Sequence, residues 1–183
     1  MSTLIALLRG INVGGKNKVP MADLRACIEA LGASDVETYI QSGNVIFDGK
    51  RLSDSTWTTR IEAALSKRFG YSATVVVRSH AELKAVVDDA PKGFGTRPDE
   101  YRYDVIFLKA PLTAAEALAK VPLKDGVDEA WAGKHVLYHA RLTARATSSR
   151  IGQIVGTPMY QQMTIRNWRT TTKLLEKCEA RSD

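Results

Sequence analysis

The apolar residues of the first eighty positions follow two spacings in turn, one typical of buried strands and one typical of helices. Residues 3–8 are almost continuously apolar, which predicts a buried strand. Leu24, Cys27, Ile28 and Leu31 recur at i, i+3, i+4 and i+7, the spacing of a helix face that packs on a core. The predicted elements are a strand at 3–8, a helix at 21–31, a hairpin of strands at 35–41 and 45–47, a helix at 53–69 and a strand at 73–77.

The order strand–helix–strand–strand–helix–strand is that of the ferredoxin-like, or α/β plait, unit. A helix at 80–87, started by Ser79 with Glu82 three residues on, and a segment at 88–100 with two prolines and two glycines follow it. The theme then repeats more loosely, with a strand at 103–108, a helix at 113–120, a hairpin at 127–131 and 136–138, a helix at 148–155, an extended piece at 163–165 and a helix at 170–179. We predict an α+β protein of two ferredoxin-like subdomains, at 1–79 and 101–183, with a connecting helix and linker at 80–100.

Composition excludes several classes of protein. The chain has 183 residues, 44% of them hydrophobic and 25% charged, which excludes overall disorder. No apolar run approaches the roughly 18–20 residues of a membrane-spanning helix, so we expect no membrane partner. The apolar N-terminus has no preceding basic region or cleavage site and is interpreted as a strand rather than a signal peptide. Cys27 and Cys178 lie in helical patterns typical of buried thiols, and a cytoplasmic location is expected.

The positive charge is unevenly distributed along the chain. The net charge is +6, but residues 1–22 carry three basic and no acidic residues, and residues 130–175 carry seven basic and no acidic residues. If the fold brings the two stretches together, they form one surface that attracts anions. If it does not, they are only an uneven solvated coat.

The segment RGINVGGKNKVP, from Arg9 to Pro20, joins the first strand to the first helix. Backbone N–H groups freed by glycine, with cations nearby, suit a phosphate or a carboxylate. Gly10, Gly15 and Lys16 have the spacing of a Walker loop, but Asn17 replaces the Ser or Thr that binds Mg²⁺, and the helix is expected only after Pro20. An exposed glycine-rich turn explains the segment equally simply. The candidate ligand-binding residues here are Arg9, Asn12, Gly14, Gly15, Lys16 and Asn17.

Two further segments supply candidate binding residues. Ser42-Gly43-Asn44 suits a hairpin turn, and Ser42 and Asn44 would offer neutral hydrogen-bonding groups close to the first loop if both lie at one sheet edge. Arg166-Asn167-Trp168 precedes the last helix, which Asn167 or Thr170 is expected to cap while Trp168 anchors it. The pair Arg166 and Arg169 beside the indole of Trp168 is also suited to bind a phosphate while the indole stacks on a base.

Common catalytic patterns are absent from the sequence. The three histidines show no metal-binding helix spacing, no HExxH or GxSxG occurs, and no cysteine lies in an exposed loop, so we expect no metal and no cofactor. Acidic residues are missing from both basic stretches, although Asp23, Asp35 and Asp104 remain able to reach a site through the fold. The sequence indicates neither a catalytic residue nor an oligomeric state, and binding is better supported than catalysis.

The same segments resemble the bacterial domain-of-unknown-function family numbered 1697. The shared pattern runs through ALLRGINVGGKNKVPMADLR, YIQSGNVIF, VVVRS and TIRNWRTTTKL, and therefore along nearly the whole chain. The resemblance implies two ferredoxin-like subdomains and no activity. The positions that match the family's motifs are Arg9, Gly10, Asn12, Gly14, Gly15, Lys16, Asn17, Ser42, Gly43, Asn44, Arg166, Asn167 and Trp168, and no established role comes with them.

Three hypotheses of function follow from these residues. The leading one is a binding module for a phosphorylated or otherwise anionic ligand, a nucleotide or small metabolite, held by the glycine-rich loop and completed by Arg166 and Trp168. Nucleic acid is the less favoured partner, because Tyr39 and Phe47 are the only aromatic residues on the first central hairpin. The second is an enzyme that acts on a phosphorylated metabolite with the same loop. The third is structural, with the motifs fastening the subdomains.

Overall fold

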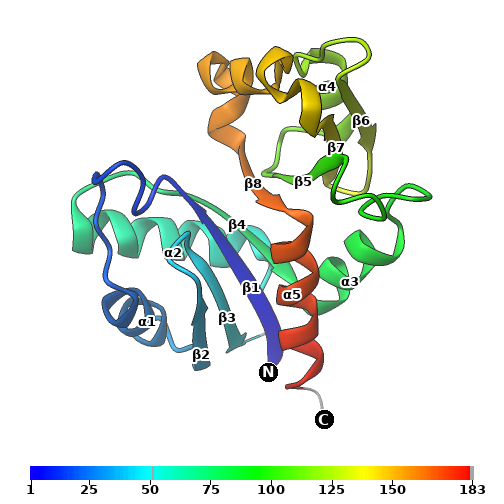
Figure 1. Ribbon diagram of the computed structural model, residues 1–183. Coiled ribbons are helices and arrows are strands. Elements are labelled where there is room, and N and C mark those ends of the chain that lie inside the picture. The colour runs from blue at the N-terminus through cyan, green and yellow to red at the C-terminus, as the bar shows by residue number, and fades with distance from the viewer. Residues whose placement is uncertain (51, 182–183) are drawn as a thin grey trace. The chain divides into compact units, whose positions relative to one another are not determined.

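The computed structural model describes residues 1–50 and 52–181, which form two compact units (Figure 1). Unit 1 runs from Met1 to Leu83 and resumes at Leu174, whereas unit 2 runs from Lys84 to Lys173. Each unit contains one four-stranded antiparallel sheet with helices packed on it. The predicted α+β class with two ferredoxin-like subdomains is confirmed.

Unit 1 has the predicted order of elements. They are β1 (Ser2–Arg9), α1 (Met21–Glu29), β2 (Ser34–Tyr39), β3 (Asn44–Gly49), α2 (Asp54–Phe69) and β4 (Thr74–Ser79). The strands lie in the order β2-β3-β1-β4, so β1 and β3 are the central pair. This is the strand order of the ferredoxin-like unit, and it carries the β1–α1 loop and the β2–β3 turn to the same end of the central strands.

Both faces of the unit 1 sheet are covered. On one face α1 and α2 bury Leu24, Ile28, Trp57, Ile61 and Leu65 against the sheet. On the other face the apolar side chains are buried as well, namely those of Ile5, Leu7, Ile46 and Val76. The C-terminal half of α5 (Trp168–Glu179), which belongs to unit 1, lies beside β2, where Lys177 Nζ donates to Glu37 Oε1 at 2.5 Å. Unit 1 therefore lacks the open aromatic sheet face with which plait domains bind RNA.

Unit 2 repeats the same strand order with different connections. Its elements are the end of α3 (His80–Asp88), β5 (Tyr101–Leu108), α4 (Ala114–Lys120), β6 (Asp128–Ala132), β7 (Val136–Leu142), the 3₁₀ helices η1 (Thr143–Ser148), η2 (Ile151–Gly156) and η3 (Pro158–Gln162), β8 (Met163–Asn167) and the start of α5. The sheet order is β6-β7-β5-β8. One face packs Ile106, Leu137 and Met163 against α4 and the 3₁₀ helices.

The prediction of an α-helix at 148–155 is wrong. The chain there forms the end of η1 and most of η2, and Ser149 between them is extended. Gly152 and Gly156 lower helix propensity, and Pro158 begins a new turn, so only short 3₁₀ pieces form. Ile151 and Ile154 are nevertheless buried in the core, as the apolar spacing indicated.

Helix starts follow the sequence signals closely. Ser79 Oγ accepts from the Glu82 backbone N–H at 3.2 Å, and Glu82 Oε2 accepts from the Ser79 backbone N–H at 2.8 Å, which is the predicted capping box. Thr113 and Glu116 form a second box at α4. Within the described residues, no helix is both long and apolar enough to cross a membrane.

Candidate functional site

The glycine-rich loop between β1 and α1 is held together by two asparagine side chains. Asn12 Nδ2 donates to Val19 O at 3.0 Å, and Asn12 Oδ1 accepts from Val19 N–H at 2.8 Å. Asn17 Nδ2 donates to Gly10 O at 2.8 Å. Both asparagines have a positive φ, of 52° and 49° respectively, which Asn tolerates better than most residues. These two side chains therefore hold the backbone of the loop in its observed shape.

The β2–β3 turn packs against this loop. Asn12 Nδ2 also donates to Gln41 O at 3.0 Å, so the two segments do lie at one edge of the sheet, a point that the sequence left open. A Cβ at Gly43, where φ is 84°, would lie 2.8 Å from Leu8 Cβ, so only glycine fits this turn. Asn44 is fully buried, and its Nδ2 donates to Tyr39 O at 2.9 Å and to Ser42 Oγ at 3.1 Å.

A shallow hollow, here called the loop hollow, remains beside this junction. It has a volume of about 360 Å³ and is lined by Asn12, Gly15, Lys18, Val19, Pro20, Met21 and Gln41. Lys18 is its single cation, because Arg9 instead donates from its guanidinium to Thr74 Oγ1 at 3.0 Å. Gly14, Lys16 and Asn17 are exposed and do not line it. Anion binding by this loop stays a prediction.

Replacing Asn12 with alanine is expected to destabilise unit 1. The side chain makes three hydrogen bonds, two that join the start of the loop to its end at Val19 and one that joins it to the β2–β3 turn. Their loss should cost about 1–3 kcal/mol of unfolding free energy, measured by urea denaturation. Asn17→Ala, which removes one bond at an exposed position, is the milder control. Equal stability of Asn12→Ala and the parent would contradict the structural role of Asn12.

The Arg166–Trp168 segment divides into a buried and an open part. Arg166 on β8 is 7% exposed, and its Nη1 donates to Thr164 Oγ1 at 2.9 Å and to Ile165 O at 2.8 Å. Burial lowers the pKa of this guanidinium to about 10. Asn167 caps α5, because its Oδ1 accepts from Thr170 N–H at 2.7 Å, as predicted. Trp168 is half-buried and packs edge to face on Phe94, with ring centroids 5.1 Å apart.

Asn167 and Trp168 open onto the largest of the hollows described here, in unit 2, which we call the arginine hollow. Its volume is about 620 Å³, and its lining residues are Gly95, Pro98, Tyr101, Arg102, Tyr103, Asp104, Arg141, Asn167, Trp168, Arg169 and Thr172. It forms because β8 pairs with β5 only from Asp104 to Leu108, which leaves the first residues of β5 without a neighbour on that side. Gly95 makes room for the indole, since a Cβ there would lie 2.2 Å from Trp168 Nε1.

Three arginines from three elements converge on this hollow. Arg102 on β5 and Arg141 on β7 are directly opposite in the sheet, and Arg169 comes from the first turn of α5. None of the three guanidinium groups has a hydrogen bond or ion pair to any residue in the described part of the chain. Arg141 Nε is in addition buried without a hydrogen-bond partner there. Asp104 is the one carboxylate in the lining, so positive charge exceeds negative charge by two.

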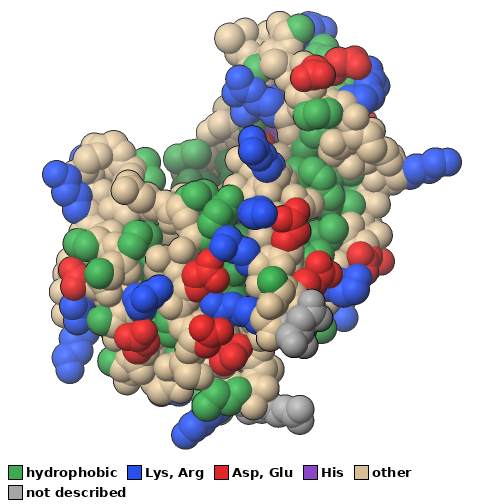
Figure 2. Space-filling view, turned by 60° about the horizontal axis from the view of Figure 1, so that its bottom comes forward, with side chains coloured by type: hydrophobic (Ala, Val, Ile, Leu, Met, Phe, Trp, Pro, Cys, Tyr) green, Lys and Arg blue, Asp and Glu red, His purple; other side chains and the backbone are tan. Residues whose placement is uncertain are grey.

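This concentration of arginine differs from the rest of the surface. On the face drawn in Figure 2, acidic and basic side chains are interspersed over most of the area. Elsewhere in the described residues, exposed basic side chains form ion pairs, such as Arg68–Asp23 at 2.8 Å and Lys84–Asp88 at 2.7 Å. The three arginines of the arginine hollow differ from these because they have no carboxylate partner among the described residues.

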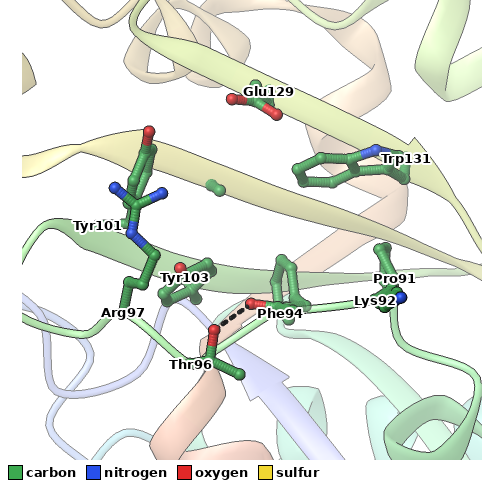
Figure 3. Close-up of a pocket in the computed structure, with 11 residues that line it drawn as sticks. Pro91, Lys92, Phe94, Thr96, Arg97, Tyr101, Tyr103, Glu129 and Trp131 are labelled. Carbon is green, nitrogen blue, oxygen red and sulfur yellow. Dashed lines mark hydrogen bonds between the residues drawn. The ribbon is translucent and has the colours of Figure 1, made fainter.

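A second hollow, the aromatic hollow, shares Tyr101 and Tyr103 with the first (Figure 3). Its volume is about 260 Å³, and Figure 3 shows Phe94, Tyr101, Tyr103, Trp131 and Glu129 around it; Ala140 is also among its lining residues. The segment Pro91–Arg97, predicted as linker, forms one side of it and is held by Thr96 Oγ1, which donates to Gly93 O at 2.8 Å. The two hollows therefore adjoin the same stretch of β5.

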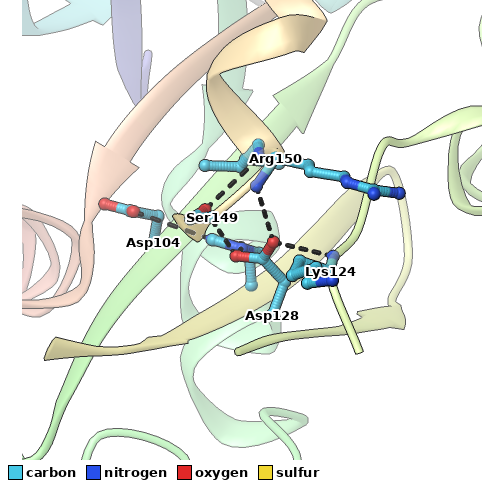
Figure 4. A network of polar contacts seen from close by, with 7 residues as sticks. Asp104, Lys124, Asp128, Ser149 and Arg150 are labelled. Carbon is cyan, nitrogen blue, oxygen red and sulfur yellow. Dashed lines mark hydrogen bonds and ion pairs between the residues drawn. The ribbon is translucent and has the colours of Figure 1, made fainter. Parts of the chain in front are cut away.

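Behind the arginine hollow lies a buried polar network (Figure 4). His139 is fully buried, with Nε2 3.2 Å from Asp128 Oδ1 and Nδ1 3.8 Å from Asp104 Oδ2. Asp128 also accepts from Ser149 Oγ at 2.5 Å and from the backbone N–H groups of Lys124 and Arg150, each at 2.9 Å. Burial alone would raise the pKa of Asp128, but these hydrogen bonds outweigh it and hold the pKa below its usual value.

Sequence reasoning found only part of the arginine hollow. Asn167 and Trp168 were predicted as site residues, and Arg169 was considered with Arg166 as an arginine pair for a phosphate. Tyr101, Arg102, Tyr103 and Arg141 were not predicted. The signal that was available is the acid-free stretch 130–175, which contains Arg141 and Arg169. The pairing of Arg102 with Arg141 depends on strand register, which the sequence does not reveal. The structure places the loop residues in unit 1 and the Arg166–Trp168 residues in unit 2.

Fold and site together define an α+β protein of two plait units with an arginine-lined hollow in the second. The family described as "Protein of unknown function (DUF1697)" matches residues 1–138, and the chain belongs to this family. Among solved structures, the conserved bacterial protein SP0830 from Streptococcus pneumoniae is 27% identical and has a TM-score of 0.83, over 97% of this chain and 98% of its own. No curated protein matches the chain. Because the family is one of unknown function, a functional proposal has to rest on the site.

Proposed function

We propose that the arginine hollow of unit 2 binds the phosphate group of a small ligand. The observation that supports this most is the convergence of Arg102, Arg141 and Arg169, all without a carboxylate partner among the described residues. Guanidinium groups bind phosphate through two parallel charge-assisted hydrogen bonds, and they are the side chains best suited to it.

The pairing of Arg102 with Arg141 also favours an anion in the hollow. Like charges directly opposite on neighbouring strands destabilise a sheet by several tenths of a kcal/mol. A phosphate between the two guanidinium groups would remove this repulsion. Its charge would also lie close to the first turn of α5, where the helix dipole favours anions.

The loop hollow of unit 1 is a weaker candidate for the same role. It offers one cation, Lys18, and the polar side chain of Asn12 that lines it is already bonded to the backbone. A small ligand is favoured over RNA because both faces of the unit 1 sheet are buried and the arginines of unit 2 surround one compact hollow.

An enzyme acting on a phosphorylated metabolite is a second candidate, supported by Asp104. This carboxylate lines the arginine hollow and lies opposite Asn167 in the sheet. His139 lies behind it, with Nδ1 3.8 Å away. A carboxylate beside a bound phosphate ester is suitably placed to take a proton from an attacking water or hydroxyl. In this candidate His139 acts only through Asp104, because it is fully buried.

A titration with ribose 5-phosphate, followed by calorimetry, tests the proposal. We expect one saturable site whose affinity falls as salt is raised, and no binding of uncharged ribose. Phosphorus NMR of the same mixture separates the two candidates, since new signals appear only if the protein converts the ester. Absence of binding at low salt, or equal binding of ribose, would contradict the proposed function.

A further inference from the structure

The aromatic hollow lies on one face of the unit 2 sheet, and the side chains of Arg102 and Arg141 lie on the other. Tyr103 pairs with Ala140 and Ala140 pairs with Glu129, so these three side chains share a face. Arg102 and Arg141 are each one residue away along their strands, and successive side chains of a strand point to opposite faces. The aromatic hollow is therefore a separate candidate site, which the proposed function does not use.

The walls of the aromatic hollow are rings that meet at steep angles. Phe94 packs on Tyr103 at 66° with centroids 4.8 Å apart, and on Trp131 at 88° with centroids 6.1 Å apart. Tyr101, Tyr103 and Trp131 are each only half-buried, so part of each ring is accessible. Ala140, 3% exposed, contributes only a methyl group to the lining. Rings at such angles enclose a corner rather than a slot, and a corner suits a rounded group better than a flat one.

The faces of these rings attract positive charge. An aromatic ring is electron-rich on its faces, and several rings together bind methylated ammonium groups, which are rounded cations. Arg97 already makes one such contact, because its guanidinium carbon lies 5.0 Å from the centroid of the Tyr101 ring. The charge of Arg97 is compensated by Glu100, to whose Oε1 its Nε donates at 3.0 Å.

Two further charges of opposite sign line the aromatic hollow. Glu129 on β6 and Lys92 on the Pro91–Arg97 segment are both exposed, and neither has a hydrogen bond or ion pair to the described residues. Figure 3 shows Glu129 on one side of the hollow and the segment that carries Lys92 on the other. A cation beside Glu129 and an anion beside Lys92 would each meet an opposite charge. Charge complementarity therefore favours a ligand that carries both signs.

We propose that the aromatic hollow binds a small zwitterion with a methylated ammonium group. The cation lies among the rings beside Glu129, and the carboxylate of the ligand points toward Lys92. A primary ammonium group is less suited, because it has three N–H donors and Glu129 is the single carboxylate among the described lining residues. The chemical class is that of the N-methylated amino acids, of which trimethylglycine is a simple member.

Three ligands of nearly equal shape test the proposal by calorimetry at low salt. Trimethylglycine carries both charges, 3,3-dimethylbutanoate has a carbon in place of the charged nitrogen, and choline has a hydroxyl in place of the carboxylate. We expect trimethylglycine to bind at least about tenfold more tightly than 3,3-dimethylbutanoate, and several-fold more tightly than choline. Equal affinity of trimethylglycine and either analogue, or no saturable binding of trimethylglycine, would overturn the inference.

Three exposed positions provide variants that test the contacts. Glu129→Gln keeps the shape of the side chain and removes its charge, so it should weaken both trimethylglycine and choline several-fold. Lys92→Gln should weaken trimethylglycine but not choline. Lys134→Gln makes the same change of charge in the turn between β6 and β7, outside the lining, and should alter neither. An effect of Lys92→Gln no larger than that of Lys134→Gln would contradict the contact between Lys92 and the carboxylate.

Two further comparisons separate this inference from its alternatives. None of the three variants should change ribose 5-phosphate binding, because the arginine hollow is a different site; a parent that binds ribose 5-phosphate but not trimethylglycine would overturn this inference alone. A peptide with a trimethylated lysine carries the same cation, but Lys92 and Arg97 disfavour a basic peptide. Binding of such a peptide far more tightly than trimethylglycine would overturn the choice of a small zwitterion.

Discussion

Arg141→Glu is expected to weaken ribose 5-phosphate binding by roughly 30- to 100-fold, which corresponds to about 2–3 kcal/mol. Arg141 lies between Arg102 and the polar network, and its Nε is buried without a hydrogen-bond partner in the described residues. The substitution removes a two-pronged donor and reverses a charge at the centre of the arginine hollow. Calorimetric titration at low salt measures the loss.

Arg141 lies in register between Arg102 on β5 and Asp128 on β6, so the introduced carboxylate would attract the first and repel the second. Urea denaturation of the variant therefore accompanies the titration, so that a loss of binding is compared between folded proteins. Lys18→Glu makes the same change of charge in the loop hollow of unit 1 and serves as the matched control. If Arg141→Glu bound ribose 5-phosphate as the parent does and Lys18→Glu did not bind it, the phosphate site would lie at the glycine-rich loop of unit 1 instead.

Asp128→Asn is expected to destabilise unit 2 by about 2–4 kcal/mol. Both oxygens of Asp128 accept hydrogen bonds, Oδ1 from Ser149 and Oδ2 from the backbone N–H groups of Lys124 and Arg150. An amide oxygen in the place of Oδ2 can still accept from the two backbone N–H groups, but its NH₂ then faces the Ser149 hydroxyl and the His139 ring, which must accept instead of donate. The negative charge that strengthens all of these hydrogen bonds is lost as well. These hydrogen bonds connect Ser149 and Arg150, in the segment between β7 and β8, to Asp128 on β6. When they are weakened, we expect this segment to unfold locally before the sheet does.

Urea denaturation measures the loss, and amide hydrogen exchange locates it. Exchange at Arg150 and Lys124 should accelerate more than exchange at the amides between β5 and β7. Because the pKa of Asp128 is lowered in the folded state, the parent should lose stability as pH falls below about 4, and Asp128→Asn should lack this part of the acid dependence. A stability within about 0.5 kcal/mol of the parent would contradict the role given to this carboxylate.

The fold was predictable from the sequence because most of its elements are specified locally. Apolar spacing, glycines and caps located the helices and strands of unit 1, and the Ser79–Glu82 capping box marked the start of α3. The chain at 148–155 was mispredicted because a helical apolar pattern and 3₁₀ turns with buried Ile151 and Ile154 look alike over so short a stretch. Gly152, Gly156 and Pro158 oppose a regular α-helix there, and the hydrogen bond from Arg150 N–H to Asp128 adds a long-range contact that the sequence does not reveal.

The candidate site was only partly predictable because it depends on pairing and burial. Arg166 and Asn12 have the residue types of ligand contacts, yet one is buried in the sheet and the other bonds the loop backbone. Arg102 and Arg141 are far apart in the sequence and become neighbours only through strand register. A glycine-rich segment stands out in a sequence, whereas a hollow made by a short neighbouring strand does not.

A crystal structure with ribose 5-phosphate bound is the most direct measurement of where the phosphate lies. We predict density for the phosphate within hydrogen-bond distance of Arg102, Arg141 and Arg169, beside Trp168 in unit 2. Phosphate density at the loop hollow, next to Gly15 and Lys18, would contradict this placement. The absence of ligand density from the arginine hollow at saturating concentration would contradict it as well.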